Sequence, residues 1–253
     1  IFKLKKRPKK NPLIVHYYDL KYVKKDCVIN KNFVKLYKKF SPGPISYVLK
    51  LKKNSLISKN VTNKKKTIAV RFPQHPITRS LLKNLKYPLA APSANISSKI
   101  SPVSKKDVLE EFGKKIKYIL DGGQSKIGLE STILNLIKKP QILRLGGLEK
   151  NKINKFLKIK NKSINKNNIV MPGQAKLHYS PQIPLRLNAK YPRQNEAIIL
   201  IKKRNFSGKN YFYLTKNKNL KQAAKNLYKT LRLIKSSVTL IEYILRASDD
   251  ACC

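Results

Sequence analysis

The sequence predicts an α/β fold: an open, twisted, mixed sheet with flanking helices, followed by a linker and a smaller α/β domain. Short strand-like runs alternate with helical stretches, but not in a strict strand–helix–strand repeat, which favours a mixed sheet over a purely parallel one. A polar, low-complexity stretch at residues 161–168 has the composition of a domain boundary. The length of 253 residues suits one larger and one smaller domain. We expect a first domain over residues 1–160, a linker over 161–183 and a second domain over 184–253.

The first half of the chain carries several strand patterns and two helical ones. Apolar residues at helical spacing predict a helix from Lys21 to Phe40, and Pro76 suits the first turn of another. In that second helix Ile77, Leu81 and Leu85 recur every fourth residue and should be buried. The strands expected in this half are Leu13–Val15, Ile45–Leu51, Thr67–Phe72 and a buried strand within Pro88–Asn95.

The second half begins with a helix marked by its own N-cap. Ser104, with Asp107 three residues on, forms a short capping box, and the helix should end at Gly113. A last helix is expected from Asn219, with an apolar face made of Leu220, Ala223, Ala224, Leu227, Leu231 and Ile234. The strands expected in this half are Ile116–Leu120, Ile133–Ile137, Gln141–Leu145, Leu185–Asn188, Ala197–Ile201 and Tyr211–Leu214, the second and third as a hairpin.

The chain is strongly basic, with 57 Lys and Arg against 12 Asp and Glu and a formal net charge of +45. A charge of this size attracts polyanions such as nucleotides or nucleic acid. The lysines nevertheless occupy nearly every polar position, beside abundant Asn and Ile. A drift in the composition of the whole sequence is therefore the explanation we favour, with a polyanionic ligand accounting for part of the bias.

The sequence shows no sign of secretion or of a membrane span. Cys27, Cys252 and Cys253 have no metal-site spacing, and an odd Cys count without a signal peptide points to a reducing compartment. No apolar run approaches the roughly 18 residues of a membrane span. We therefore expect a cytoplasmic protein with no membrane partner and no metal held by its own side chains.

Two cations in the first loop suit a polyphosphate. Lys5 and Arg7 flank one residue and precede Pro8, and in an extended backbone their heads would project to the same side. The Arg fork and the Lys point charge together suit a chain of phosphates. A solvated basic loop is the competing interpretation, and it is a strong one in a chain this rich in Lys.

Two residues in short apolar strands are candidates for a small ligand. Arg71 lies in an apolar run, where an Arg needs a partner, so it should face an anion such as a substrate carboxylate or form a structural salt bridge. His16 ends the strand that begins at Leu13, and a lone His there is more often structural than catalytic.

Small polar residues stand at the ends of two other strands. Ser93 and Asn95 close the run PLAAPSAN, where the backbone can approach a ligand, although they could equally cap a turn. Ser131 and Thr132 precede the strand that starts at Ile133 and can offer hydroxyl and N–H groups to a carboxylate or a phosphate.

In this order the stretches KKRPKKNPLIVH, SPGP, VRFPQHP, APSAN, GLEST and LRLGG resemble the threonylcarbamoyl-AMP synthase family, the YrdC-like enzymes, in its longer two-domain form. HYSP and NLKQAAKNLYKTLR resemble the linker and the C-terminal domain of that form. The resemblance implies a YrdC-like open twisted sheet, a linker that acts as a lid, and a smaller Rossmann-like domain.

The resemblance also implies a reaction. The family's enzymes are nucleotidyltransferases that make threonylcarbamoyl-AMP from L-threonine, bicarbonate and ATP, for modification of an adenosine in tRNA. A downstream tRNA threonylcarbamoyl transferase machinery is an implied partner, and direct contact with tRNA is left open. Mg²⁺ is expected with ATP, held mainly by phosphates and water because the sequence offers no carboxylate pair. Such a step depends on positioning and charge neutralisation, so no catalytic residue is assigned beyond substrate positioning.

The residues that match the family's motifs divide between the two larger substrates. The matches to ATP-binding positions are Lys5, Arg7, Asn11, Thr67, Ser93, Asn95, Ser101, Arg144 and Tyr179. The matches to L-threonine-binding positions are His16, Arg71 and Ser131, with Arg71 suited to the carboxylate.

Two departures from the family's pattern and two rival functions accompany the resemblance. The family carries a strand and turn of the PTETVYGL type ahead of the region that matches Ile1, and Ser236–Cys253 does not resemble the family's ending. We expect a chain truncated at both ends, so that residues 1–253 alone are weak or inactive.

One rival is a non-catalytic module that binds double-stranded RNA or tRNA, against which stands the lack of aromatic stacking motifs. The other, a YrdC-like carbamoyltransferase, predicts zinc-type Cys pairs that the sequence lacks.

Overall fold

The computed structural model describes residues 1–158, 179–187, 192–193, 196–202, 208 and 210–237. The chain packs as two compact units, one of residues 1–93 with 130–176 and one of residues 94–129 with 177–253. Residues 94–129, expected in the first domain, group with the C-terminal part because Ile100 and Val103 share a buried cluster with Ala197 and Leu214. The expected linker lies outside the described residues except for residues 179–183.

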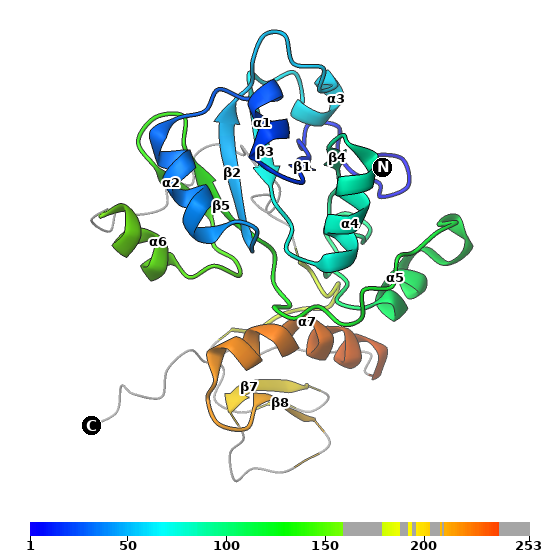
Figure 1. Cartoon of the computed structure of the whole chain (residues 1–253). Helices are drawn as coiled ribbons and strands as arrows, with labels where there is room; N and C mark the ends of the chain where they lie inside the picture. The colour runs from blue at the N-terminus through cyan, green and yellow to red at the C-terminus, as the bar shows by residue number, and fades with distance from the viewer. Residues whose placement is uncertain (159–178, 188–191, 194–195, 203–207, 209, 238–253) are drawn as a thin grey trace. The chain divides into compact units, whose positions relative to one another are not determined.

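The first unit is built on a six-stranded mixed sheet (Figure 1). Its strands are β1 (Ile14–His16), β2 (Ile45–Lys50), β3 (Thr67–Arg71), β4 (Leu89–Ala90), β5 (Thr132–Asn135) and β6 (Gln141–Arg144). They lie in the order β4-β1-β3-β2-β5-β6. The pairs β1–β3 and β2–β5 are parallel and the other three are antiparallel. The mixed sheet and the β5–β6 hairpin expected from the sequence are confirmed.

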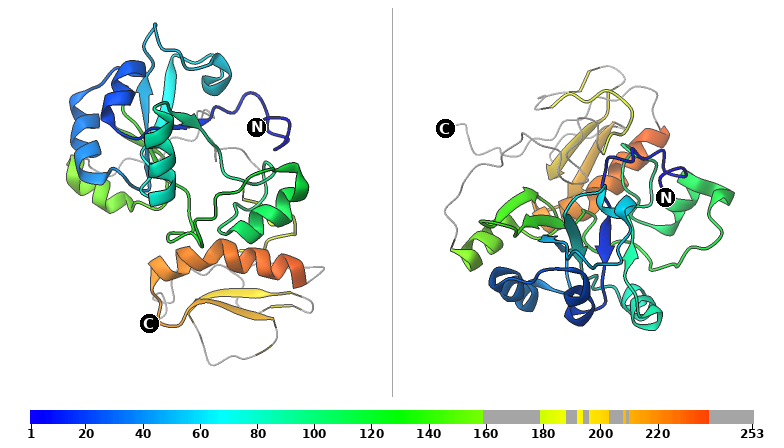
Figure 2. Two further views of the ribbon diagram at one scale, coloured as in Figure 1. Left: turned by 45° about the vertical axis from the view of Figure 1, so that its right-hand side comes forward. Right: turned by 90° about the horizontal axis from the view of Figure 1, so that it is seen from above.

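The two faces of this sheet carry different sets of side chains, because successive residues of a strand point to opposite faces. Tyr47 and Leu49 of β2 and Val70 of β3 belong to the main apolar core. Val48 and Ala69 belong to a smaller buried cluster. The helices α1 (Leu20–Asp26), α2 (Lys31–Phe40) and α6 (Lys150–Leu157) cover the main-core face (Figure 2).

The single helix expected from Lys21 to Phe40 is in fact the two helices α1 and α2. Asn30 stands between them as the N-cap of α2, with its Oδ1 accepting from the amide of Phe33 at 2.9 Å. Its Nδ2 donates to the carbonyl of Leu136 at 2.7 Å. Apolar spacing hides the break because both helices pack on the same core.

Two other expectations for the first unit are wrong in part. Helix α4 (Pro76–Leu85) forms, but Leu82 is its buried residue, Leu81 and Leu85 are half-buried, and Ile77 is exposed. The run from Pro88 gives only β4, which is half-buried because it is an edge strand paired with β1 alone. A short helix, α3 (Lys59–Thr62), interrupts the connection between β2 and β3.

The described part of the second unit holds a parallel strand pair and helical segments. These are α5 (Lys105–Phe112), a 3₁₀ turn (Gly113–Lys115), β7 (Ile198–Lys202), β8 (Tyr211–Thr215) and α7 (Leu220–Ser237). The capping box of Ser104 and Asp107 is confirmed. Helix α7 lies across one face of the β7–β8 pair (Figure 1). None of the described helices is long and apolar enough to cross a bilayer.

Two strands expected in this part do not form. Residues 116–120 have no partner strand in the described chain, and Tyr118 and Leu120 are exposed. Residues 185–187 are not a strand either, and residue 188 lies outside the described residues. On α7, Leu220 is exposed and Tyr228 is buried, because the apolar cluster under the helix begins at Ala223.

Candidate functional site

Three strands of the first unit bring polar side chains to one edge of the sheet. The register pairs His16 of β1 with Arg71 of β3, and Arg71 with Ser46 of β2. All three fall on strand positions that point away from α1, α2 and α6. Ser131, just before β5, reaches the same edge, since its Oγ lies 2.7 Å from the Ser46 Oγ. The three residues that match L-threonine-binding positions are thus brought together.

Arg71 carries a buried donor that the described residues leave without a partner. Its Nε is shielded from solvent and has no hydrogen-bond partner among them. No described acidic side chain lies within ion-pair distance of Arg71, so the structural salt bridge considered from the sequence does not form there. Burial and then the charge of Arg144 lower the pKa of Arg71, and Glu130 opposes the shift. A carboxylate placed here would supply the missing acceptors.

Ser131 is held by two neighbours. Arg144 donates to the Ser131 carbonyl from Nε at 3.2 Å and from Nη2 at 2.8 Å, and Nη2 also reaches the Ser131 Oγ at 3.2 Å. Ser46 and Ser131 are both buried. Arg144, which matches an ATP-binding position, therefore lies among the residues that match the threonine site. The sequence patterns did not reveal Ser46, although a Ser within an otherwise apolar strand was a signal for it.

Gly146, which follows β6, is required by the close approach of two backbone segments. A Cβ on Gly146 would lie 2.3 Å from the carbonyl O of Glu130 and 2.7 Å from the carbonyl C of Ser131. The amide of Gly147 donates to the Glu130 carbonyl at 2.7 Å. The LRLGG motif therefore packs its backbone directly against GLEST.

Several residues that match ATP-binding positions lie near the opposite ends of these strands. Asn11 precedes β1 and Thr67 begins β3, and because these strands are parallel both lie at the end away from Arg71. Ser93 follows β4, which runs antiparallel to β1 and so returns toward this end. The Nζ of Lys5 donates to the Ser93 carbonyl at 2.5 Å. The sheet thus separates these matches along the strands from the group around Arg71.

The expected geometry of the first loop is wrong. Lys5 and Arg7 do not lie on an extended backbone, because Lys6 has a left-handed φ of 48° and the amide of Arg7 donates back to the carbonyl of Phe2 at 2.9 Å. The Lys5 ammonium is buried, while the Arg7 guanidinium donates to the Pro12 carbonyl at 2.9 Å. The two heads therefore have different partners.

The remaining matches to ATP-binding positions belong to the second unit. Asn95 and Ser101 are buried. The Nδ2 of Asn95 donates to two backbone carbonyls of its own loop at 2.9 and 2.8 Å, as the turn-capping interpretation of this residue expects. Tyr179 stacks on Tyr228 of α7, with ring centroids 5.6 Å apart and an interplanar angle of 27°.

His16 is a neutral imidazole near pH 7. Burial, with the nearby charge of Arg71 as the second cause, lowers the pKa of His16 to about 4. Its Nδ1 is buried and has no hydrogen-bond partner among the described residues. The ring therefore adds no positive charge beside Arg71.

The described residues do not fit a metal ion held by the protein itself. They contain no group of three or more His, Cys, Asp and Glu side chains that could ligate one. The side chains gathered at the two edges are mainly cations and hydroxyls, which suit an anion instead.

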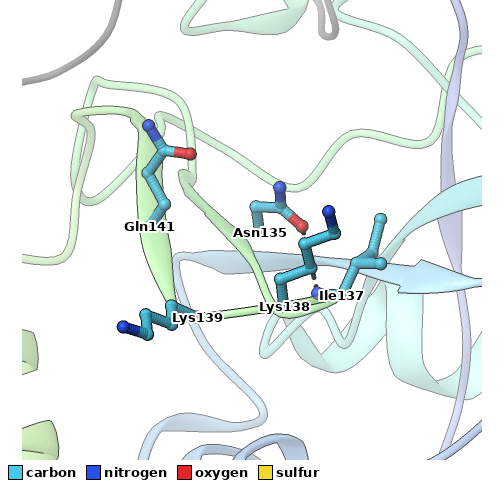
Figure 3. A pocket seen from close by; sticks show the side chains of 5 residues that line it. All are labelled: Asn135, Ile137, Lys138, Lys139 and Gln141. Atoms are coloured by element: carbon cyan, nitrogen blue, oxygen red, sulfur yellow. Dashed lines mark hydrogen bonds between the residues drawn. The ribbon is translucent and has the colours of Figure 1, made fainter.

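A separate hollow of about 670 Å³ lies at the turn between β5 and β6. Figure 3 shows the side chains of Asn135, Lys138 and Lys139 around it, with the amide of Ile137 bonded to Asn135 Oδ1 at 3.1 Å. It lies at the end of β5 away from Ser131, and none of the site residues predicted from the sequence lines it.

Two family models match the chain. Residues 1–146 match the Sua5/YciO/YrdC model, described as telomere recombination, and residues 140–249 match the C-terminal domain of threonylcarbamoyl-AMP synthase. The threonylcarbamoyl-AMP synthase of Pyrococcus abyssi is 34% identical, and the alignment covers 92% of this chain and 74% of the relative. That of Schizosaccharomyces pombe is 36% identical, with 76% of this chain and 55% of the relative covered.

A solved structure agrees with these sequence matches. The crystal structure of P. abyssi Sua5 complexed with L-threonine superimposes with a TM-score of 0.85 at 30% identity, over 98% of this chain and 78% of that one. The α/β fold class with two domains is therefore confirmed. The chain belongs to the threonylcarbamoyl-AMP synthase family, a family of nucleotidyltransferases that serve tRNA modification.

Proposed function

We propose that this protein is an L-threonylcarbamoyladenylate synthase, which joins L-threonine, bicarbonate and ATP and releases pyrophosphate. The observation that carries the proposal is the buried Nε of Arg71, which has no hydrogen-bond partner among the described residues. Arg71 pairs in register with Ser46, whose Oγ lies 2.7 Å from that of Ser131, and both Arg71 and Ser131 match the family's amino-acid site. A relative of the same family was crystallised with L-threonine.

The threonine carboxylate would bind the Arg71 guanidinium, because a carboxylate supplies two acceptors to the fork and a counter-charge to a partly buried cation. Ser131 would contribute its hydroxyl. The neutral ring of His16 leaves a nitrogen that can accept a hydrogen bond from the substrate. This arrangement keeps the carboxylate occupied and leaves the amine to react.

The chemistry follows from that orientation. Bicarbonate takes up a proton and loses water to give CO₂. The unprotonated amine adds to CO₂ to give a carbamate, and the proton that the amine releases replaces the one consumed. A carbamate oxygen then attacks the α-phosphorus of ATP, and the bond to the β-phosphate oxygen breaks to release pyrophosphate. Arg144 lies beside Ser131 and would neutralise charge where the two substrates meet. Mg²⁺ bound to the triphosphate would supply further neutralisation, with phosphates and water as its main ligands.

The nucleotide would use the residues that match the family's ATP signature. These are Lys5, Arg7, Asn11, Thr67, Ser93, Asn95, Ser101, Arg144 and Tyr179. The Lys5–Ser93 bond supports the proposal because it joins two motifs of that signature. We also propose the cytoplasm as the site of action, where ATP and tRNA are available.

The second candidate is an RNA-binding module, which the net charge of +45 favours. Lys5 is buried and Arg71 half-buried, so neither is arranged like a cation that tracks an exposed phosphate backbone. Direct tRNA contact would add to the synthase activity rather than replace it.

The test is pyrophosphate release from ATP, measured with L-threonine and bicarbonate together and with each left out. Release that needs both, and that Arg71→Met abolishes, supports the synthase. RNA binding that survives Arg7→Ala and Ser93→Ala, without threonine-dependent release and without threonine or ATP binding, supports the module instead. The assay on residues 1–253 also measures how active this chain is alone.

A further inference from the structure

The loop Asn95–Ser101, called the SAN loop below, is folded back on itself. The Nδ2 of Asn95 bonds to the carbonyls of Ile96 and Lys99 at 2.9 and 2.8 Å. Asn95 and Ser101 are exposed by only 3% and 6%. The loop is too short to hold this shape by an apolar core of its own, so its neighbours must fix it.

Glu111 of α5 supplies an anion under this loop. Its Oε1 accepts from the amide of Ile96 at 3.0 Å and lies 3.3 Å from the Lys99 ammonium. The Glu111 side chain is 7% exposed. A carboxylate this buried is costly unless it is paired, and the partners it has here are largely on the SAN loop.

Arg232 of α7 completes the arrangement from the other side. Its Nη2 donates to the carbonyl of Ile100 at 2.6 Å and lies 3.7 Å from Glu111 Oε2. Arg232 is 14% exposed. Glu111 therefore holds the beginning of the SAN loop, Arg232 holds its end, and the two charges face each other.

The same face of α7 also holds the segment that carries Tyr179. Tyr228 lies one turn before Arg232, at the i and i+4 spacing that places two side chains on one face of a helix. Tyr228 stacks on Tyr179, and the amide of Ser180 donates to the carbonyl of Ser98 at 2.8 Å. One helical face thus orders both elements of this unit that match ATP-binding positions.

We propose that Glu111 and Arg232 are positioning residues for the nucleoside triphosphate: they fix the shape of the SAN loop, which holds Asn95 and Ser101, the two matches to ATP-binding positions. The proposal rests on the proposed function, because Asn95 and Ser101 serve ATP only if the protein uses it. It gives the C-terminal helix α7 a part in nucleotide binding through residues that do not touch the nucleotide.

The test compares Arg232→Met, Glu111→Gln and the double variant with the original protein. Each single variant should weaken ATP binding about tenfold, the cost of roughly one well-placed hydrogen bond, while threonine binding stays within about twofold. The double variant should bind ATP about as weakly as either single variant, because the two residues act as one unit. Lys106→Met is the control, since Lys106 is exposed on α5 and its ammonium lies 3.9 Å from the exposed Glu110 carboxylate.

A second readout separates positioning from general stability. Amide hydrogen exchange of the SAN loop should rise in Arg232→Met at a temperature where the unfolding midpoint shows both proteins to be folded. Unchanged ATP affinity with unchanged exchange would overturn the proposal, as would an equal loss of ATP and threonine affinity. If the original protein bound no ATP, the proposed function would fail, and exchange alone would still show whether Glu111 and Arg232 hold the loop.

Discussion

The ammonium of Lys5 donates a hydrogen bond to the carbonyl of Ser93 at 2.5 Å, across a sequence separation of 88 residues. Lys5 is 5% exposed, so this cation is held against the end of the PLAAPSAN run rather than in solvent. The solvated loop considered from the sequence does not describe Lys5. A nucleotide phosphate that approached this end would meet a cation already fixed in place, which lowers the ordering cost of binding.

The first prediction concerns this cation. Lys5→Met should raise the KM for ATP by about tenfold, because one charge-assisted contact is lost, and should leave the KM for L-threonine nearly unchanged. Lys3→Met is the control from the same turn, where the side chain is exposed. Equal effects of the two substitutions would show that the buried position has no special role.

The second prediction concerns the threonine carboxylate. Arg71→Lys keeps the charge but loses the fork, so the KM for L-threonine should rise roughly tenfold to a hundredfold. Steady-state kinetics with threonine and ATP varied separately would measure it. Arg79→Lys is the matched control, because the Arg79 guanidinium has partners of its own: it stacks on the Tyr18 ring and donates to the Tyr18 carbonyl. A rise in the ATP KM alone would contradict the assignment of Arg71.

The third prediction concerns the buried hydroxyl pair. Ser46→Ala or Ser131→Ala removes one partner and leaves the other hydroxyl short of a bond, so each should lower the free energy of unfolding by about 1–3 kcal/mol. The double variant should cost less than the two losses added together. Urea denaturation of the four proteins measures this coupling, and strictly additive losses would mean that the Ser46–Ser131 bond contributes nothing.

The fourth prediction concerns pH. The pKa of His16 falls from 6.5 to about 4 on folding, so between these values the unfolded chain binds more protons than the folded one. Stability should therefore fall as the pH drops from 6.5 to 4, by up to about 3 kcal/mol from this group, and change little below that through His16. In His16→Asn the slope of unfolding free energy against pH should be smaller in this window. An identical slope in both proteins would refute the burial of a neutral His16.

The fifth prediction concerns Gly146. Gly146→Ala should destabilise the protein by about 1–3 kcal/mol, because the new Cβ meets backbone atoms of Glu130 and Ser131 that cannot turn aside. Gly208→Ala is the milder control, since its Cβ would meet only the ring of Tyr211 at 3.2 Å. Thermal unfolding should show a clear drop for the first variant, and a smaller drop than for the control would contradict the close approach.

Much of the fold could be predicted because the patterns were local. The hairpin of β5 and β6, the capping box at Ser104 and the strands β7 and β8 each depend on residues close in sequence. The division of the helix at Asn30 could not be predicted, since it depends on a bond to Leu136 far along the chain. Residues 116–120 have strand-forming composition but no neighbouring strand to pair with in the described structure, and composition does not reveal that.

The candidate site divides in the same way. Arg71 could be found because a charge in an apolar strand is conspicuous, and motif resemblance supplied Ser131 and Arg144. The grouping of Glu111 with Arg232 could not be found, because 121 positions separate two ordinary surface-type residues that only the fold makes neighbours. The direction in which the Arg7 side chain points could not be predicted from the sequence either, since it depends on the left-handed backbone at Lys6.

The fate of labelled bicarbonate is the most direct test of the proposed reaction. The protein would be given ATP, L-threonine and ¹⁴C-bicarbonate. The adenylate formed would be isolated, and its mass would be determined by mass spectrometry. If Arg71 holds the threonine carboxylate, the label should appear in threonylcarbamoyl-AMP, and the product should be absent when threonine is omitted. An unlabelled threonyl adenylate, made through the carboxylate itself, would contradict the account.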